Sequence, residues 1–207
     1  MTQFFRFIFL SLLVILINGC SSKAPFKNIL KTNQTIEQRN TILSKLNDWQ
    51  INGKIAFIQG KKREATSLRW QYEKSNNSQK LDLNSYLGIN VLQLKSNNNI
   101  HTIKLDGQSY RSENLDQLIA SLSGFTLPTQ ALTYWLKGLV YNPNDKIDYH
   151  PETLLPLALI SEYNNEQWQI RYENYQLVNN DVPLATKFTI KQNDLTIRIS
   201  VNKWTLL

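Results

Sequence analysis

The residue with the clearest chemistry is Cys20, the only cysteine in the 207-residue chain. It follows Ile17-Asn18-Gly19, and upstream lie one positive charge, Arg6, and an apolar run over residues 7–17. A charged start, an apolar core of this length and a small residue before the cleavage point are typical of an export signal. The run is shorter than the ~20 apolar residues that cross a bilayer. A thiol at the cleavage point can accept diacylglycerol, so we expect lipid attachment at Cys20.

Residues 1–19 are therefore expected to be a signal peptide, and Cys20 the first residue of the mature chain. The alternative is a plain signal peptide that happens to contain a cysteine. With no second cysteine, no intramolecular disulfide is expected. Several acyl chains on one residue anchor a protein firmly, whereas one chain does not. Ser21, and not the aspartate that retains bacterial lipoproteins in the inner membrane, follows Cys20. We expect a lipid-anchored protein of the outer membrane that faces the periplasm.

Reactive side chains elsewhere do not form a recognisable catalytic or metal site. The two histidines, His101 and His150, lie far apart in the chain without cysteines or acidic pairs at ligand spacing. Asp145, Asp148 and His150 fall in one segment rich in Asn and Pro, and a solvated loop is the simpler interpretation. No nucleophile elbow, Walker loop or dinucleotide fingerprint occurs. We expect no enzyme, no metal and no cofactor.

Composition bounds the remaining chain to one domain of ordinary size. The sequence is 42% hydrophobic and 11% aromatic, which is enough for a substantial core. The net charge of +7 suits work near anionic lipid, and it suits a solvated surface without a specific partner equally well. Nucleic acid is disfavoured by the export signal and by the lack of a recognition motif. We expect a lipidated N-terminus and tether over residues 20–32 and a single domain over 33–207.

Three segments have helical patterns. Residues 33–46 place apolar side chains near one face, with Asn33 or Thr35 as a possible N-cap. Residues 113–123 form a second amphipathic segment that ends at Gly124. Pro128 then begins a third, because proline is favoured in the first turn of a helix.

The rest of the chain alternates with the period of two that is typical of strands. From Trp49 onward short strands are separated by polar turns as far as residue 105, and strands resume over 157–163, 167–172, 185–191 and 195–202. We predict an α+β fold, mainly antiparallel β: a curved incomplete β-barrel (half-barrel) with helices as a lid over an apolar cavity. The expected cavity walls are Ile55, Phe57, Leu68, Trp70, Leu81 and Leu83 from the strands and Leu118, Leu122, Trp135 and Leu136 from the helices.

One turn departs from ordinary turn chemistry. The turn that joins two strands is Asn84-Ser85-Tyr86-Leu87-Gly88. It carries two large, mainly apolar side chains, Tyr86 and Leu87, at positions where turns usually have small polar residues. One interpretation is a loop whose Leu87 folds back onto the core. The other is a membrane insertion loop of Tyr86, Leu87 and Gly88 that touches a bilayer. Burying one leucine is worth roughly 1.5–3 kcal/mol, enough for transient contact but not for anchoring.

Taken in order along the chain, these motifs resemble the LolB family of outer-membrane lipoprotein receptors. The likeness runs from the Cys20 motif through Leu46-Asn47-Asp48-Trp49, Gly53-Lys54-Ile55-Ala56-Phe57, Leu68-Arg69-Trp70-Gln71, Leu87-Gly88, Val91-Leu92-Gln93-Leu94, Tyr134-Trp135-Leu136-Lys137-Gly138 and Val201-Asn202-Lys203-Trp204. The resemblance implies a half-barrel with a helical lid around a cavity for acyl chains. It also matches Leu87 to the family's protruding-loop leucine. Tyr86 and Val140 stand where the family often has proline.

The function that the resemblance implies is acceptance of lipoproteins from the periplasmic carrier LolA, followed by insertion into the outer membrane through non-covalent transfer of acyl chains. The implied partners are a LolA-type carrier, lipid-modified cargo lipoproteins and the inner leaflet of the outer membrane, with the chain a monomer. The alternative is an outer-membrane lipoprotein that binds another lipid or apolar ligand without onward transfer. A scaffold lipoprotein would instead have a packed interior without a cavity.

Overall fold

The computed structural model of the protein describes residue 30 and residues 34–207. The expected signal peptide, Cys20 and all of the tether except residue 30 lie outside the described residues. The described chain contains three helices and eleven strands. The helices are α2 (Ile36–Lys45), α3 (Leu115–Ser123) and α4 (Thr129–Trp135). The strands are β1 (Asp48–Gln59), β2 (Lys62–Glu73), β3 (Ser78–Asn84), β4 (Asn90–Asn97), β5 (Ile100–Leu105), β6 (Gln108–Ser112), β7 (Lys146–Tyr149), β8 (Pro156–Tyr163), β9 (Glu166–Val178), β10 (Val182–Gln192) and β11 (Leu195–Leu206).

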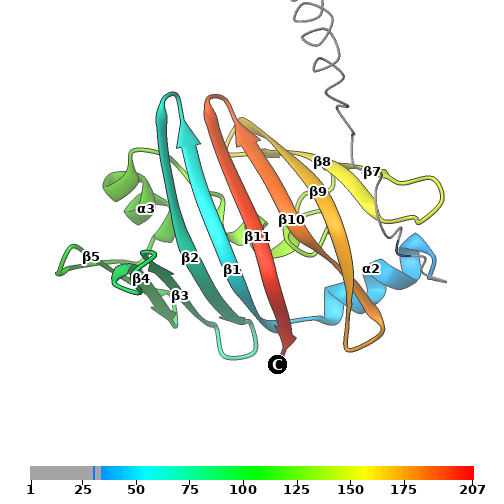
Figure 1. Ribbon diagram of the computed structural model, residues 1–207, viewed down its shortest axis with the longest axis horizontal. Helices are drawn as coiled ribbons and strands as arrows, with labels where there is room; N and C mark the ends of the chain where they lie inside the picture. Colours follow the sequence, from blue (N-terminus) through cyan, green and yellow to red (C-terminus); the bar gives the residue numbers. More distant parts are fainter. Residues whose placement is uncertain (1–29, 31–33) are drawn as a thin grey trace, which may run out of the picture.

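All eleven strands form one antiparallel sheet in the order β6-β5-β4-β3-β2-β1-β11-β10-β9-β8-β7 (Figure 1). Two meanders therefore meet where the first strand pairs with the last. A register shift at Asn52/Gly53 lies in this β1–β11 pair. A Cβ on Gly53 would collide with the carbonyl group of Ser200, so glycine permits the close approach of the two strands here. The strands β6 and β7 form the two edges of the open sheet.

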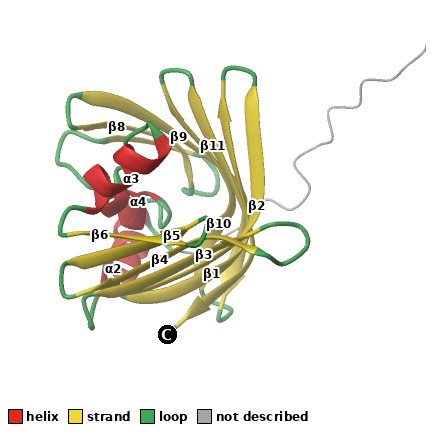
Figure 2. Cartoon of the chain, turned by 90° about the vertical axis from the view of Figure 1, so that its left-hand side faces the viewer, coloured by secondary structure: helices red, strands yellow, loops and turns green. Residues whose placement is uncertain are grey.

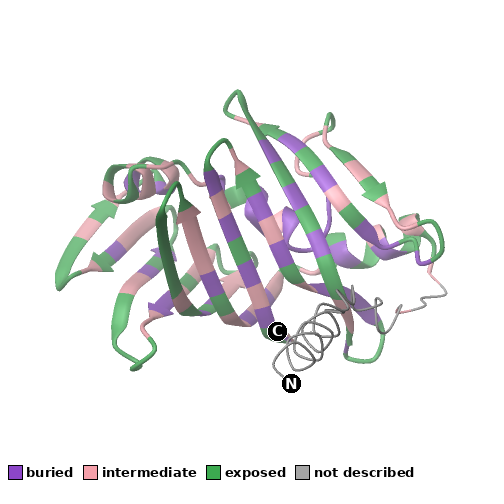
Figure 3. Ribbon diagram, turned by 45° about the horizontal axis from the view of Figure 1, so that its top comes forward, coloured by how far each residue is buried: buried purple, intermediate pink, exposed green. Residues whose placement is uncertain are grey.

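The sheet has one apolar face and one polar face. Along its long strands buried residues alternate with partly buried or exposed ones (Figure 3), as in β11, where Leu195, Ile197, Ile199 and Val201 are all buried. The sheet curves so that its apolar face surrounds the three helices (Figure 2). We call this apolar side the inner face and the opposite side the outer face.

Local sequence explains where the helices begin and end. The Thr35 hydroxyl accepts a hydrogen bond from the Gln38 backbone N–H, and the Gln38 side chain accepts one from the Thr35 backbone N–H, which forms a capping box for α2. The Asn114 side chain caps α3, and Gly124 ends it in the left-handed conformation (φ 79°). Helix α4 follows Pro128 directly.

The half-barrel prediction is confirmed, and the differences from the sequence-based elements are local. Two edge strands, β6 and β7, were not expected. The segment containing Asp148 and His150 was expected to be a solvated loop; that is wrong for Asp148, which lies in β7 because residues 146–149 pair with β8. Strand β9 also continues to Val178, six residues beyond the expected end. No helix in the described part of the chain is long and apolar enough to cross a membrane.

Candidate functional site

The ten side chains predicted to line a cavity lie on the inner face of the sheet and on the helices that it surrounds. Ile55, Leu68, Trp70, Leu83, Trp135 and Leu136 are buried in one large core cluster, with Phe57 and Leu81 packed against it. The other two, Leu118 and Leu122, belong to a second cluster under α3 with Leu94 and Ile103. In this structure these side chains pack against one another. Such packing also fits the scaffold alternative, so acyl-chain binding by the ten residues stays a prediction.

Aromatic rings form the centre of this interior. Trp49 contacts Trp70, Tyr72 and Trp204, with ring centroids 5.2, 5.5 and 5.6 Å apart. Trp49 is fully buried and Trp204 nearly so, and neither was among the ten predicted residues. The inward position of Trp49 follows from the alternation along β1, which could have identified it. Trp204 is out of step with Val201, because the register of the β1–β11 pair shifts opposite Asn52/Gly53. Large aromatic side chains supply much of the apolar surface of a core.

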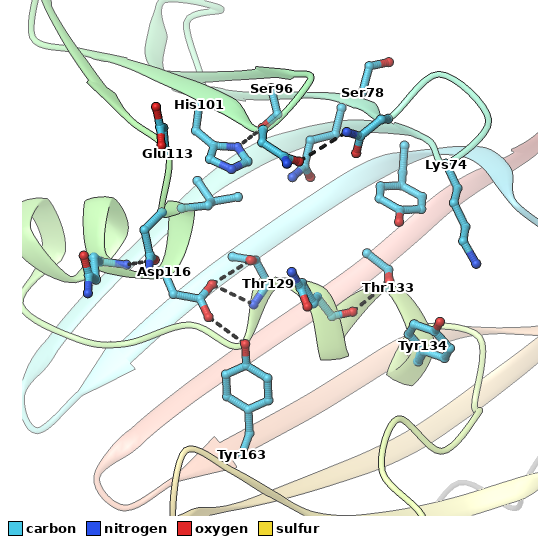
Figure 4. Close-up of a pocket in the computed structure, with 18 of the residues that line it drawn as sticks. Lys74, Ser78, Ser96, His101, Glu113, Asp116, Thr129, Thr133, Tyr134 and Tyr163 are labelled. Carbon is cyan, nitrogen blue, oxygen red and sulfur yellow. Dashed lines mark hydrogen bonds between the residues drawn. The ribbon is translucent and has the colours of Figure 1, made fainter.

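A hollow of about 1010 Å³ lies beside this interior, at the turns that join β2 to β3 and β4 to β5, next to α3 and α4. None of the ten predicted residues lines it. Its walls are largely polar (Figure 4) and include Lys74, Ser96, His101, Glu113, Asp116, Thr133, Tyr134 and Tyr163. Sequence reasoning missed this hollow because its residues come from five separate segments of the chain, within residues 72–79, 96–101, 113–120, 126–141 and 163–164.

Asp116 joins three elements at the hollow. Its Oδ1 accepts hydrogen bonds from the Thr129 hydroxyl at 2.6 Å and from the Thr129 backbone N–H at 3.3 Å. Its Oδ2 accepts a hydrogen bond from the Tyr163 hydroxyl at 2.7 Å (Figure 4). Burial, followed by this contact with Asp116, raises the pKa of Tyr163 above its usual range. Asp116 thus ties α3 to the start of α4 and to the end of β8.

The two histidines have separate local roles. At the hollow, His101 Nδ1 lies 2.8 Å from the Ser96 hydroxyl, and burial lowers the pKa of His101. His150 Nδ1 accepts hydrogen bonds from the backbone N–H groups of Glu152 and Thr153 in a turn. Within residues 34–207, no three His, Cys, Asp or Glu side chains gather in a way that could hold a metal ion.

Two buried cations hold the helices together. Arg39 of α2 is 2% exposed, and its guanidinium donates to the carbonyl oxygens of Lys137 and Gly138 at 2.8 and 3.3 Å. Lys137 Nζ donates in turn to the Leu46 carbonyl oxygen at 2.9 Å, and burial lowers the pKa of Lys137 to about 8. Cations are favoured at helix C-termini, where carbonyl groups lack partners. This arrangement fastens α2 to the end of α4.

The loop between β3 and β4 points into solvent. Tyr86 is fully exposed and Leu87 is 81% exposed, so Leu87 does not fold back onto the core. The loop is closed by hydrogen bonds from the Ser85 N–H to the Ile89 carbonyl at 2.8 Å and from the Gly88 N–H to the Ser85 carbonyl at 3.0 Å. Gly88 has φ 79°, a conformation that glycine adopts without strain. The exposed apolar surface continues through Ile89 and Val91.

The loop and the hollow lie at opposite ends of the same strands. The loop connects the end of β3 to the start of β4, whereas the hollow is lined by Ser78 at the start of β3 and Ser96 near the end of β4. Six residue steps, from Asn90 to Ser96 along β4, separate them, which at ~3.3 Å per residue is roughly 20 Å. Two different partners can therefore contact the two ends at once.

Comparison with known proteins identifies relatives along nearly the whole chain. The family model "Outer membrane lipoprotein LolB" matches residues 47–204. The outer-membrane lipoprotein LolB of Pseudoalteromonas translucida is 28% identical over 96% of this chain and 94% of its own length. That of Vibrio cholerae is 28% identical over 94% and 93%, and that of Shewanella frigidimarina is 32% identical over 75% of each chain.

Solved structures support the fold. A LolA superfamily protein from Nitrosomonas europaea aligns with a TM-score of 0.52 at 9% identity, covering 82% of this chain and 93% of its own. A putative outer-membrane lipoprotein-sorting protein domain from Vibrio parahaemolyticus aligns with a TM-score of 0.55 at 8% identity, covering 82% and 89%. At such identities the similarity concerns the half-barrel alone. The match of the family model to most of the chain shows that it belongs to the LolB family of outer-membrane lipoproteins.

Proposed function

We propose that this chain accepts lipid-modified proteins from a LolA-type periplasmic carrier and places them in the outer membrane by non-covalent transfer of their acyl chains. The observation that carries the proposal is an apolar half-barrel interior under helices, combined with an exposed apolar loop on the same strands. Family membership supports a role in lipoprotein localisation. In this proposal the chain is a monomer, residues 1–19 are removed, and acyl chains on Cys20 anchor residues 33–207 as one domain.

Acyl chains would enter between the inner face of the sheet and helices α3 and α4. The inner side chains pack together in this structure, so entry requires these helices to move away from the sheet. Among the described residues, the Tyr163–Asp116 hydrogen bond ties α3 to β8 and would break in such a movement, whereas the hydrogen bonds from Thr129 to Asp116 hold α3 to α4. The polar hollow beside them would contain the non-lipid part of the cargo, which is hydrated and peptide-like.

Transfer of this kind needs no covalent chemistry. Moving one CH₂ group between two apolar interiors changes the free energy little, whereas exposing it to water costs ~0.8 kcal/mol. An acyl chain of ordinary length would therefore face a large barrier in water, and direct contact between the openings of carrier and acceptor avoids it. Differences in affinity for the cargo then set the direction of transfer.

Leu87 would act at the last step, release of cargo into the membrane. Its exposure and its separation from the hollow leave it free to contact lipid while cargo occupies the interior. We expect Leu87→Glu to preserve folding and acceptance of cargo from the carrier but to block incorporation into liposomes, because a carboxylate does not enter hydrocarbon readily. Leu177→Glu is the matched control, since Leu177 is an exposed leucine on β9, far from the loop in the sheet.

The assay follows a radiolabelled lipoprotein from the purified carrier to this protein and then to liposomes. Normal incorporation with Leu87→Glu would contradict the role of the loop. Failure of the unchanged protein to take cargo from the carrier would contradict the proposed function. In that case, binding of a free lipid would favour the alternative of an apolar-ligand protein without onward transfer.

A further inference from the structure

The outer face of the sheet carries a marked excess of positive charge near the Leu87 loop. On strands β2–β6 the outward side chains include six exposed cations and two partly or fully buried acids, Glu73 and Asp82. The cations are Arg63, Arg69, Lys80, Lys95, Lys104 and Arg111. On strands β7–β10 the outer face has four exposed cations and three exposed acids. The excess is therefore concentrated on one half of the sheet.

The two acids of that half leave most of this charge unpaired. Glu73, at the end of β2, accepts hydrogen bonds from the side chains of Gln71 and Asn76. Asp82 is buried, accepts a hydrogen bond from Gln93 at 2.8 Å, and lies 3.5 Å from Lys80. Lys80 pairs directly with Lys95 across β3 and β4, and like charges in this position destabilise a sheet. Within residues 34–207, Lys95, Lys104 and Arg111 form no ion pair with an acidic side chain. An external anionic surface that approaches these cations would therefore stabilise them by reducing their mutual repulsion.

The cations and the exposed apolar segment form one continuous surface. Val91 projects on the outer face of β4, two residues before Gln93, and Gln93 pairs with Lys104. Lys80, Lys95 and Arg111 lie in one row across β3 to β6, which at ~4.8 Å per strand spacing extends over roughly 15 Å. Apolar side chains that can enter hydrocarbon thus stand beside charges that can contact headgroups.

We propose that the outer face of β2–β6 is a docking surface for anionic phospholipid headgroups, which holds the 86–91 segment at the membrane. The inference rests on the proposed function for its location at a membrane and extends it by naming the lipid class. Charge complementarity favours lipid over a protein partner here, because the cations share the outer face with the apolar Val91, whereas the hollow where a carrier would deliver cargo is lined by inner-face side chains such as Ser96 and His101. Fifteen residues separate Cys20 from Thr35 and span at most ~50 Å, so the anchor does not prevent this face from reaching the surface.

The test uses the chain from residue 20 onward with Cys20→Ala, so that no acyl chain supplies the affinity. Co-sedimentation is measured with vesicles of phosphatidylcholine alone and of phosphatidylcholine mixed with phosphatidylglycerol. The test variant combines Lys95→Gln, Lys104→Gln and Arg111→Gln. The control combines Lys146→Gln, Lys187→Gln and Lys191→Gln on the other half of the outer face, with the same change in net charge.

We expect binding that requires phosphatidylglycerol and weakens with salt. Each cation near an anionic surface contributes about fivefold to affinity, so the test variant should lose on the order of a hundredfold and the control much less. Equal losses by both variants would overturn the proposal in favour of net charge alone. Unchanged vesicle binding with lost capture of the carrier would overturn it in favour of a protein partner.

A parallel assay of cargo acceptance in solution separates this inference from the proposed function. The test variant should accept cargo from the carrier as the unchanged chain does, because its substitutions lie on the outer face. If the unchanged chain accepts no cargo, the proposed function fails, whichever way the vesicle result falls. If it accepts cargo but binds anionic and neutral vesicles equally, only the docking surface fails.

Discussion

The hydrogen bond from Tyr163 to Asp116 offers a direct measure of how firmly α3 is held over the sheet. Tyr163→Phe keeps the ring, which contacts Tyr141 at 5.9 Å between centroids, and removes only the donor. A hydrogen bond to a charged group contributes about 1.5–3 kcal/mol. Because Tyr163 and Asp116 are only partly buried and Thr129 still donates to Asp116, we expect a loss of about 1.5 kcal/mol, at the lower end.

A double-mutant cycle isolates this bond. Asp116→Asn keeps the shape of the side chain but replaces one acceptor oxygen and removes the charge. Urea unfolding of the unchanged protein, each single variant and the double variant gives four free energies of unfolding. We expect a coupling energy of about 1 kcal/mol or more between the two positions. If the two effects add to within about 0.5 kcal/mol, the bond contributes nothing and the reasoning is refuted.

The same variant tests whether α3 must move during uptake. If the bond restrains the helix, Tyr163→Phe should accept cargo from the carrier at least as fast as the unchanged protein while being less stable. Thr129→Val, which removes the other hydroxyl donor to Asp116, serves as a second variant with the same expected direction. Slower acceptance by both variants would show that these bonds organise the entrance and do not restrain it.

Two further predictions concern the end of α4. A Cβ on Gly138, which has φ 68°, would lie 2.9 Å from the Arg39 guanidinium. Gly124 also has a positive φ, but a Cβ there would meet open space, so Gly138→Ala should destabilise the protein by about 1–2 kcal/mol more than Gly124→Ala. Equal losses of stability in urea unfolding would argue against the contact with Arg39. The lowered pKa of Lys137, about 8 against an ordinary value of 10.5, means that above pH 8 the unfolded chain holds a proton that the folded chain has lost, so stability should rise by up to about 2 kcal/mol between pH 8 and 9.5. Lys137→Met should abolish this rise, and a rise of the same size in the variant would assign it to another group.

The sheet and its curvature could be predicted because alternation along the strands and polar turns are local signals. Thr35 and Gln38 form a recognisable capping box, and Gly124 marks the end of α3. Strand β7 could not be recognised, because its four residues follow a segment rich in Asn and Pro and pair only with β8. Its existence depends on a neighbour that the local sequence does not reveal.

The site was predicted less completely than the fold. Inward-facing apolar residues such as Trp70 follow from the period of two, but the polar hollow depends on contacts between distant segments. Arg39 and Lys137 carry charges, so their sequence positions indicate exposed helix surface. They are buried because the carbonyl groups of Lys137, Gly138 and Leu46 offer them partners. Only the assembled helices show this.

The open edges of the sheet determine how the protein can accommodate acyl chains of different size. A closed barrel has a fixed circumference, and widening it would rupture a complete ladder of backbone bonds. Here β6 and β7 end the sheet, and Asp116, just after β6, meets Tyr163, at the end of β8. A single side-chain hydrogen bond thus joins the two ends of the sheet. Breaking that hydrogen bond would allow the two edges of the sheet to move apart while all backbone hydrogen bonds between strands remain.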